Sequence, residues 1–294
     1  MNKDREALYA LLGDLPDRAL SISARTVAVD ENEDFFTEHL VLSLNGIEEV
    51  PAFFTRPVEK KEKYPVMLFS HSHGGFYKMG KNELLSPAPY GYPVPYAKAL
   101  AQRGIACLAI DHWCFGERHG RSESATFKSM LWKGQVMWGM MVYDSLRALD
   151  YLVARPDVDA SRIGVTGISM GCTMSIWVAA LDERVKICAD LCCLTDFEEL
   201  ERCGDLDAHG IFYYVPGLTK CFTMADICKL ITPRPHLSTA GLYDNLTPVK
   251  GLDKIEGALA DGGGFELKRY PCGHLETRAM REDVLGFIAG YLMG

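Results

Sequence analysis

The chain has 294 residues, of which 48% are hydrophobic and 24% are charged, and its formal net charge is -8. This composition excludes a disordered chain, and the length suits one large α/β domain with an insertion. No apolar run approaches the roughly 18 residues of a membrane-spanning helix, and the charged start at 1–6 is unlike a signal peptide. The negative charge argues against nucleic acid or an anionic membrane as a partner. The simplest interpretation of this composition is a soluble enzyme domain, and the small-molecule partner that we expect follows from the candidate site residues.

The placement of the cysteines indicates whether the protein works in an oxidising or a reducing compartment. The chain has ten cysteines, and most of them lie inside apolar runs such as 187–194. No Cys-x-x-Cys pair suggests a zinc ribbon. We expect these thiols to act as small core residues, which predicts a reducing, cytoplasmic location.

The first elements are a helix and a hairpin. Residues 3–12 predict a short amphipathic helix. The stretches 35–44 and 50–56 predict an antiparallel strand pair joined around Asn45-Gly46, because Asn-Gly is a strong turn signal. We accordingly divide the chain into an N-terminal helical extension, 1–34, and a main domain that follows it.

A glycine-rich turn follows the next strand. An apolar strand is predicted at 65–70, and it runs into 71–75, His-Ser-His-Gly-Gly. Glycines in such a turn let the backbone approach a ligand closely. The His-x-His pair could also hold a metal ion, but zinc needs three or four ligands and no acidic residue lies close by in the sequence. We expect no metal and no cofactor, with His71 hydrogen-bonded beneath the loop.

The middle of the chain predicts mainly core. Residues 81–95, rich in proline and tyrosine, are expected to arch irregularly beside the glycine-rich turn. The methionine- and tryptophan-rich stretch 130–141 and the helix at 143–153 are expected to pack in the core. Trp113 and Trp132 are left open as substrate contacts.

Residues 167–171 read Gly-Ile-Ser-Met-Gly, directly after a β-branched strand at 163–166 and before an apolar helix at 172–181. A serine between two glycines can occupy a strained strand-to-helix turn, which pushes its hydroxyl out of the sheet. The pentapeptide is a weak signal by itself, but its strand and helix context is the one that this turn requires. We predict Ser169 as a nucleophile.

A nucleophilic serine needs a base and a carboxylate that orients the base. In folds that carry the serine on such a strand-to-helix turn, the chain order is serine, acid, histidine, and the acid and the base each follow the end of a strand. A strand at 236–243 stops at Asp244, and a strand at 265–270 is followed by Pro-Cys-Gly and His274. Asp244 is the predicted acid and His274 the predicted base. Asp244 could instead cap a helix, and Asp196 is a rival acid.

An acyl-transfer site also needs hydrogen-bond donors for the oxyanion. One is expected from the backbone N–H of Met170, at the start of the helix. The second is predicted at the N–H of His73, with Gly74 as the near alternative.

About forty residues separate two predicted strands, more than a usual connection. This insertion, at about 197–234, predicts a small helical cap. Its aromatic and methionine residues either line an acyl or alcohol pocket or fasten the cap to the body, and these are Phe212, Tyr213, Tyr214, Phe222 and Met224.

Several segments resemble the α/β-hydrolases, and within them the bacterial esterases related to acetyl xylan esterase and dienelactone hydrolase. The segments are 69–75, 111–118, 167–171, Asp244 and Gly273-His274. The resemblance spans about 35–292. It implies an α/β-hydrolase domain at 35–294 with a mostly parallel sheet of about eight strands, and Ser169, Asp244 and His274 as nucleophile, acid and base.

The resemblance also places 111–118 near the mouth of the site, so Gly74, Trp113 and Cys114 are expected substrate contacts. Dienelactone hydrolases carry a cysteine nucleophile where this chain has Ser169, which favours an ordinary ester. The first glycine of the usual His-Gly turn is replaced by Ser72.

These residues predict a serine carboxylesterase that cleaves short-acyl esters through an acyl-enzyme, with acetyl as the acyl group by family analogy. A serine peptidase or amidase, or a thioesterase, would use the same three side chains. A non-catalytic binding protein of this fold is a further alternative. The sequence is compatible with a homo-oligomer.

Overall fold

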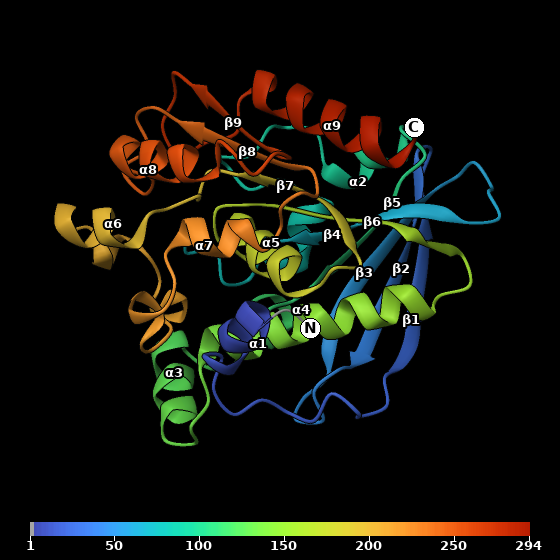
Figure 1. The fold of residues 1–294 in the computed structure, drawn as a ribbon. Helices are drawn as coiled ribbons and strands as arrows, with labels where there is room; N and C mark the ends of the chain where they lie inside the picture. The colour runs from blue at the N-terminus through green and yellow to red at the C-terminus, as the bar shows by residue number, and fades with distance from the viewer. Residues whose placement is uncertain (1–2) are drawn as a thin grey trace.

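The computed structural model describes residues 3–294 and contains one sheet of nine strands. Figure 1 shows this sheet running through the molecule between layers of helices. The strand order is β1-β2-β3-β5-β4-β6-β7-β8-β9. The strands are β1 Ser23–Glu31, β2 Phe35–Ser43, β3 Val50–Pro57, β4 Tyr64–Ser70, β5 Ala106–Ile110, β6 Val158–Ile168, β7 Val185–Leu191, β8 His236–Gly241 and β9 Phe265–Tyr270. Strands β5, β4, β6, β7, β8 and β9 run parallel, whereas β1, β2 and β3 are joined antiparallel. The predicted mostly parallel sheet is confirmed.

Helices cover both faces of this sheet. The α-helices are α1 Lys3–Ala10, α2 Tyr96–Ala101, α3 Glu123–Leu131, α4 Met137–Ala154, α5 Met170–Leu181, α6 Phe197–Cys203, α7 Met224–Lys229, α8 Val249–Leu259 and α9 Arg278–Leu292. Helices α2 and α9 pack on one face, and α1, α4 and α5 pack on the other (Figure 1). Along β4, Val66 and Leu68 join one core while Met67 and Phe69 join the other. Both faces of the central strands are therefore buried, as parallel sheets require.

Residues 3–294 also contain five short 3-10 helices. They are η1 Gly80–Leu84, η2 Gly116–Arg118, η3 Leu206–Ala208, η4 Ile211–Tyr213 and η5 Leu218–Lys220. The last three lie in the insertion between β7 and β8, together with α6 and α7.

The carboxyl ends of the parallel strands meet at one edge of the sheet, where open α/β sheets bind ligands. Four of the predicted site segments follow these ends. The turn 71–75 follows β4, Ser169 follows β6, Asp244 comes after β8 and His274 after β9. The topology thus gathers segments that are far apart in the chain.

Strand β1 differs from the sequence prediction. Ser23–Glu31 lies inside the range that we expected to be a helical extension, and it pairs antiparallel with β2. All nine residues of β1 are exposed, so the alternation of buried and exposed residues that marks a strand in a sequence is missing. The sheet therefore has nine strands where about eight were expected.

The methionine- and tryptophan-rich stretch lies mostly in the core. Met137, Trp138 and Met140 of α4 are buried, whereas Trp132, at the end of α3, is 94% exposed. All ten cysteines are free, and seven of them are buried. Within 3–294, none of the helices combines the length and the apolar character that crossing a bilayer requires.

Candidate active site

Ser169 stands on a sharp turn between β6 and α5. Its φ of +58° and ψ of -120° are rare for a residue with a side chain, and such strain is typical of functional sites. The flanking glycines are needed for packing, because a Cβ on Gly171 would lie 1.9 Å from the carbonyl oxygen of Ser70 and one on Gly167 would lie 2.4 Å from it. The Gly-x-Ser-x-Gly pattern thus lets the turn press against the end of β4.

The structure brings Ser169, His274 and Asp244 into one hydrogen-bonded row. His274 Nε2 lies 2.9 Å from Ser169 Oγ, and His274 Nδ1 lies 2.7 Å from Asp244 Oδ2. In the neutral tautomer that fits this row, Nδ1–H donates to the carboxylate and Nε2 accepts from the serine hydroxyl. The imidazole can therefore take the hydroxyl proton while the carboxylate orients the ring.

The structure shows where Asp244 and the rival Asp196 lie relative to the nearby helix starts. Helix α8 begins after Pro248, so Asp244 is not its N-cap, and Asp244 Oδ1 instead accepts from the N–H of Leu246 at 2.9 Å. The rival Asp196 is the N-cap of α6, where it accepts from the N–H of Glu199 at 2.9 Å. The structure brings Asp244, and not Asp196, to His274.

The environment of His274 favours its charged form. Burial lowers the pKa of this imidazole, but the hydrogen bond and the charge of Asp244 outweigh burial, so the pKa lies above its ordinary value. The Asp244 side chain is fully buried, whereas that of His274 is 23% exposed. A histidine held in this way is stabilised when it receives a proton.

The glycine-rich turn after β4 leaves two backbone donors available. Among residues 3–294, no hydrogen-bond acceptor lies at the N–H of His73 or of Gly74, whereas the N–H of Gly75 donates to His73 Nδ1 at 3.1 Å. Gly74 has a φ of +47°. Met170 is the first residue of α5, where N–H groups lack partners within the helix. The predicted donors His73 and Gly74 thus have free backbone N–H groups among residues 3–294, and the predicted donor Met170 stands in the first turn of α5.

The two histidines of this turn have separate partners. Both ring nitrogens of His71 are occupied, because Nδ1 donates to the carbonyl oxygen of Ser72 at 2.9 Å and Nε2 accepts from the N–H of His112 at 3.1 Å. Burial lowers the pKa of His71 to about 4. His73 Nε2 lies 3.2 Å from Oε1 of Glu123, the first residue of α3. Glu123 is an acidic neighbour that sequence proximity did not reveal.

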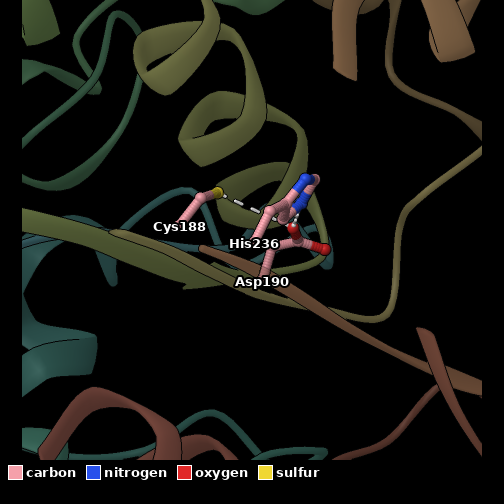
Figure 2. A group of neighbouring side chains, drawn as sticks. All are labelled: Cys188, Asp190 and His236. Atoms are coloured by element: carbon pink, nitrogen blue, oxygen red, sulfur yellow. Dashed lines mark hydrogen bonds and ion pairs between the residues drawn. The ribbon is translucent and has the colours of Figure 1, made fainter. Parts of the chain in front are cut away.

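One other group of side chains has the composition of a metal site. Among residues 3–294, one ligand atom each of Cys188, Asp190 and His236, all buried, lie within 4.8 Å of one another (Figure 2). Asp190 Oδ2 already accepts from His236 Nε2 at 2.5 Å, and Oδ1 accepts from Ser238 Oγ at 2.6 Å. Cys172 Sγ, from the first turn of α5, also donates to Oδ1 at 3.1 Å. Asp190 therefore ties β7, β8 and α5 together.

A cavity of about 230 Å³ opens at Ser169. Its lining residues come from the glycine-rich turn, the start of α5 and the insertion, and they are His73, Gly74, Gly75, Ser169, Met170, Thr173, Cys193, Ala208, His209, Gly210, Phe212, Tyr213, Leu246 and His274. Gly74 thus lies where a substrate contact was predicted. Trp113 and Cys114 instead line a separate cavity of about 740 Å³, so the structure does not bring them to Ser169.

The aromatic and methionine residues of the insertion lie at the cavity beside Ser169, at a neighbouring cavity and in the core. Phe212 and Tyr213 line the cavity at Ser169, and Tyr214 lines an adjoining one. Phe222 and Met224 are buried and pack into the main core. Phe212 and Tyr213 belong to the same core, so these two residues both line the cavity and attach the insertion to the body.

Comparisons with known proteins identify the family of this chain. The model of the acetyl xylan esterase family matches residues 29–213, well over half of the chain. The chain is 47% identical over 295 residues to YtaP of Bacillus subtilis (strain 168), a candidate hydrolase, covering 98% of each chain.

Solved structures show the same fold. Acetyl xylan esterase 1 from Thermoanaerobacterium sp. JW/SL YS485 superposes with a TM-score of 0.70 at 16% identity, over 98% of this chain and 92% of that one. The acetyl xylan esterase from Paenibacillus sp. R4 superposes with a TM-score of 0.69 at 21% identity, over 99% of this chain and 93% of that one. The chain therefore belongs to the acetyl xylan esterase family and is an ester-hydrolysing enzyme of the α/β-hydrolase fold.

Proposed function

We propose that this enzyme is a serine carboxylesterase that cleaves small, short-acyl esters through an acyl-enzyme. The observation that carries the proposal is the hydrogen-bonded row Ser169, His274 and Asp244 beside a cavity of about 230 Å³. A serine, a base and an orienting acid in this order are the parts that acyl transfer needs.

In the first half-reaction, Ser169 Oγ attacks the ester carbonyl carbon while His274 Nε2 takes the hydroxyl proton. The ester C–O bond then breaks, and His274 gives its proton to the departing alcohol. In the second half, water attacks the acyl-serine, His274 takes a proton from the water, and the proton returns to Ser169 as the acid leaves. Asp244 stabilises the imidazolium in both halves.

The negative oxygen that forms on the carbonyl carbon would be held by the backbone N–H groups of Met170 and His73, with Gly74 as the near alternative. The free N–H of His73, among residues 3–294, and the place of Met170 at the start of α5 support this assignment. Removing one such donor in other hydrolases costs about 3 to 4 kcal/mol of transition-state stabilisation.

The cavity supports a small, uncharged acyl group. Its lining, within the described part of the chain, has no Lys or Arg that would pair with a substrate carboxylate, and Phe212, Tyr213 and Leu246 give it apolar walls. A volume of about 230 Å³ leaves little room for a long chain. Family membership supports acetyl as the acyl group. The buried free thiols support a reducing, cytoplasmic location.

A substrate panel separates this proposal from its alternatives. We expect turnover of p-nitrophenyl acetate, weaker turnover of the butyrate, and little turnover of an aminoacyl p-nitroanilide or an acyl thioester. A fluorophosphonate should label Ser169. Preference for the anilide or the thioester would favour the amidase or thioesterase alternative, and failure to label Ser169 would favour the non-catalytic binding protein.

A further inference from the structure

The Ser72 side chain is bound by a buried carboxylate. Glu83 Oε2 accepts from the N–H of Ser72 at 2.6 Å and from Ser72 Oγ at 2.7 Å. Both residues are buried. We call residues 72–75 the oxyanion loop. Ser72 directly precedes the amides of His73 and Gly74, so its two hydrogen bonds to one carboxylate oxygen hold the start of this loop in place.

Tyr90 closes the same network from the other side. Its hydroxyl is hydrogen-bonded to Ser72 Oγ. A Cβ on Gly74 would lie 2.5 Å from the Tyr90 hydroxyl oxygen, so the loop packs directly on this side chain. The Tyr90 ring centroid lies 6.0 Å from that of His274. Tyr90 therefore contacts the loop on one side and the ring of the proposed base on the other.

Glu83 itself stands on an anchored element. It belongs to η1, where the N–H of Lys81 donates to Asp111 Oδ1 at 2.7 Å and Lys81 Nζ donates to Asp111 Oδ2 at 2.8 Å. A Cβ on Gly80 would lie 2.1 Å from Asp111 Oδ1, and one on Gly116 would lie 2.0 Å from it. The segment 111–118, expected at the mouth of the site, thus holds η1 in place.

From these contacts we infer that Glu83 is a positioning residue, which acts through Ser72 and Tyr90 to hold the oxyanion loop in its catalytic geometry. Glu83 and Ser72 do not line the cavity at Ser169, whereas His73, Gly74 and Gly75 of the loop do. The inference rests on the proposed function. Because amides stabilise an oxyanion only at the correct distance, a displaced loop lowers kcat more than it weakens substrate binding.

The surroundings of Glu83 suit an uncharged substitute. Burial raises the pKa of this carboxyl to about 7. The two hydrogen bonds from Ser72 lower the pKa, and the nearby charge of Glu276 raises it. Oε2 can accept from Ser72 in either protonation state. A glutamine at this position keeps an oxygen acceptor of the same reach.

The test compares Glu83→Ala with Glu83→Gln in the full-length enzyme, with p-nitrophenyl acetate as substrate. We expect Glu83→Ala to lower kcat about 10- to 100-fold, with KM within about threefold of wild type. A trifluoromethyl ketone forms an oxyanion on Ser169, so its Ki should rise by a similar factor. Glu83→Gln should stay within about threefold of wild type in both measurements.

The matched control is Asp182→Asn, which removes another buried carboxylate, at the far end of α5, where Asp182 accepts from Arg184 at 2.9 Å. It should leave kcat unchanged. If Glu83→Ala does not fold, Ser72→Ala and Tyr90→Phe take its place, with an expected kcat loss of about 3- to 10-fold at unchanged KM.

The inference is overturned if Glu83→Ala, or both substitute variants, keep wild-type kcat, if glutamine fails to rescue, or if kcat falls while the ketone Ki does not change. These results are distinct from failure of the proposed function, which would appear as a wild-type enzyme that neither cleaves the ester nor is labelled at Ser169.

Discussion

His274 Nε2 lies 2.9 Å from Ser169 Oγ, although 105 residues separate the two along the chain. The contact exists because both residues follow parallel strands, β6 and β9, whose carboxyl ends reach the same edge of the sheet. The sheet therefore places an imidazole within proton-transfer distance of a hydroxyl that stands on the strained turn after β6.

Replacing the hydroxyl tests the nucleophile directly. We expect Ser169→Ala to lower kcat for p-nitrophenyl acetate by about five to six orders of magnitude, as the loss of a triad serine does elsewhere. The circular dichroism spectrum and Tm should stay close to wild type, because the turn and its two glycines are unchanged. A rate within about tenfold of wild type would reject Ser169 as the nucleophile.

Replacing Asp244 tests whether this carboxylate, and not Asp196, orients His274. We expect Asp244→Asn to lower kcat by about four orders of magnitude, because the amide no longer holds the imidazole in the tautomer that accepts the serine proton. The control is Asp196→Asn, which alters the cap of α6 and should cost up to about 1 kcal/mol of stability with kcat retained. Equal losses of kcat in the two variants would contradict the assignment of Asp244.

The pH profile tests the base. His274 must be neutral to accept a proton, and its pKa is raised above the ordinary 6.5, with the influence of Asp244 exceeding that of burial. Activity should therefore be complete above this raised pKa and fall as pH decreases through it, with the midpoint of kcat/KM above pH 6.5. In Asp244→Asn the midpoint should move to lower pH. A wild-type rate that stays flat down to about pH 5 would exclude His274 as the base.

Local signals in the sequence were sufficient to find the three side chains of the row. Each stands just beyond a strand whose own pattern is readable, and the fold type dictates their order. The partners of the loop were not readable, because Glu83 and Glu123 reach Ser72 and His73 only through the placement of η1 and α3 in space. Trp113 was expected at the site from its segment alone, and the structure places it at another cavity.

The size of the cavity sets the acyl preference that we predict for the enzyme. Phe212 is buried and lines the cavity at Ser169, so Phe212→Ala should enlarge the space beside the acyl group. We expect the ratio of kcat/KM for p-nitrophenyl butyrate to that for the acetate to rise about tenfold or more, since each added methylene is worth about 1 to 3 kcal/mol in a fitted pocket.

The matched control is Phe222→Ala, which removes a phenyl group of the same insertion that is buried but does not line this cavity. Both variants lose buried apolar surface and should be destabilised by about 3 to 5 kcal/mol, so a general loosening of the insertion would change the ratio in both. A change confined to Phe212→Ala places the acyl group in this cavity. An unchanged ratio there would mean that the acyl chain lies elsewhere, because added volume beside a bound acyl group must favour the longer one.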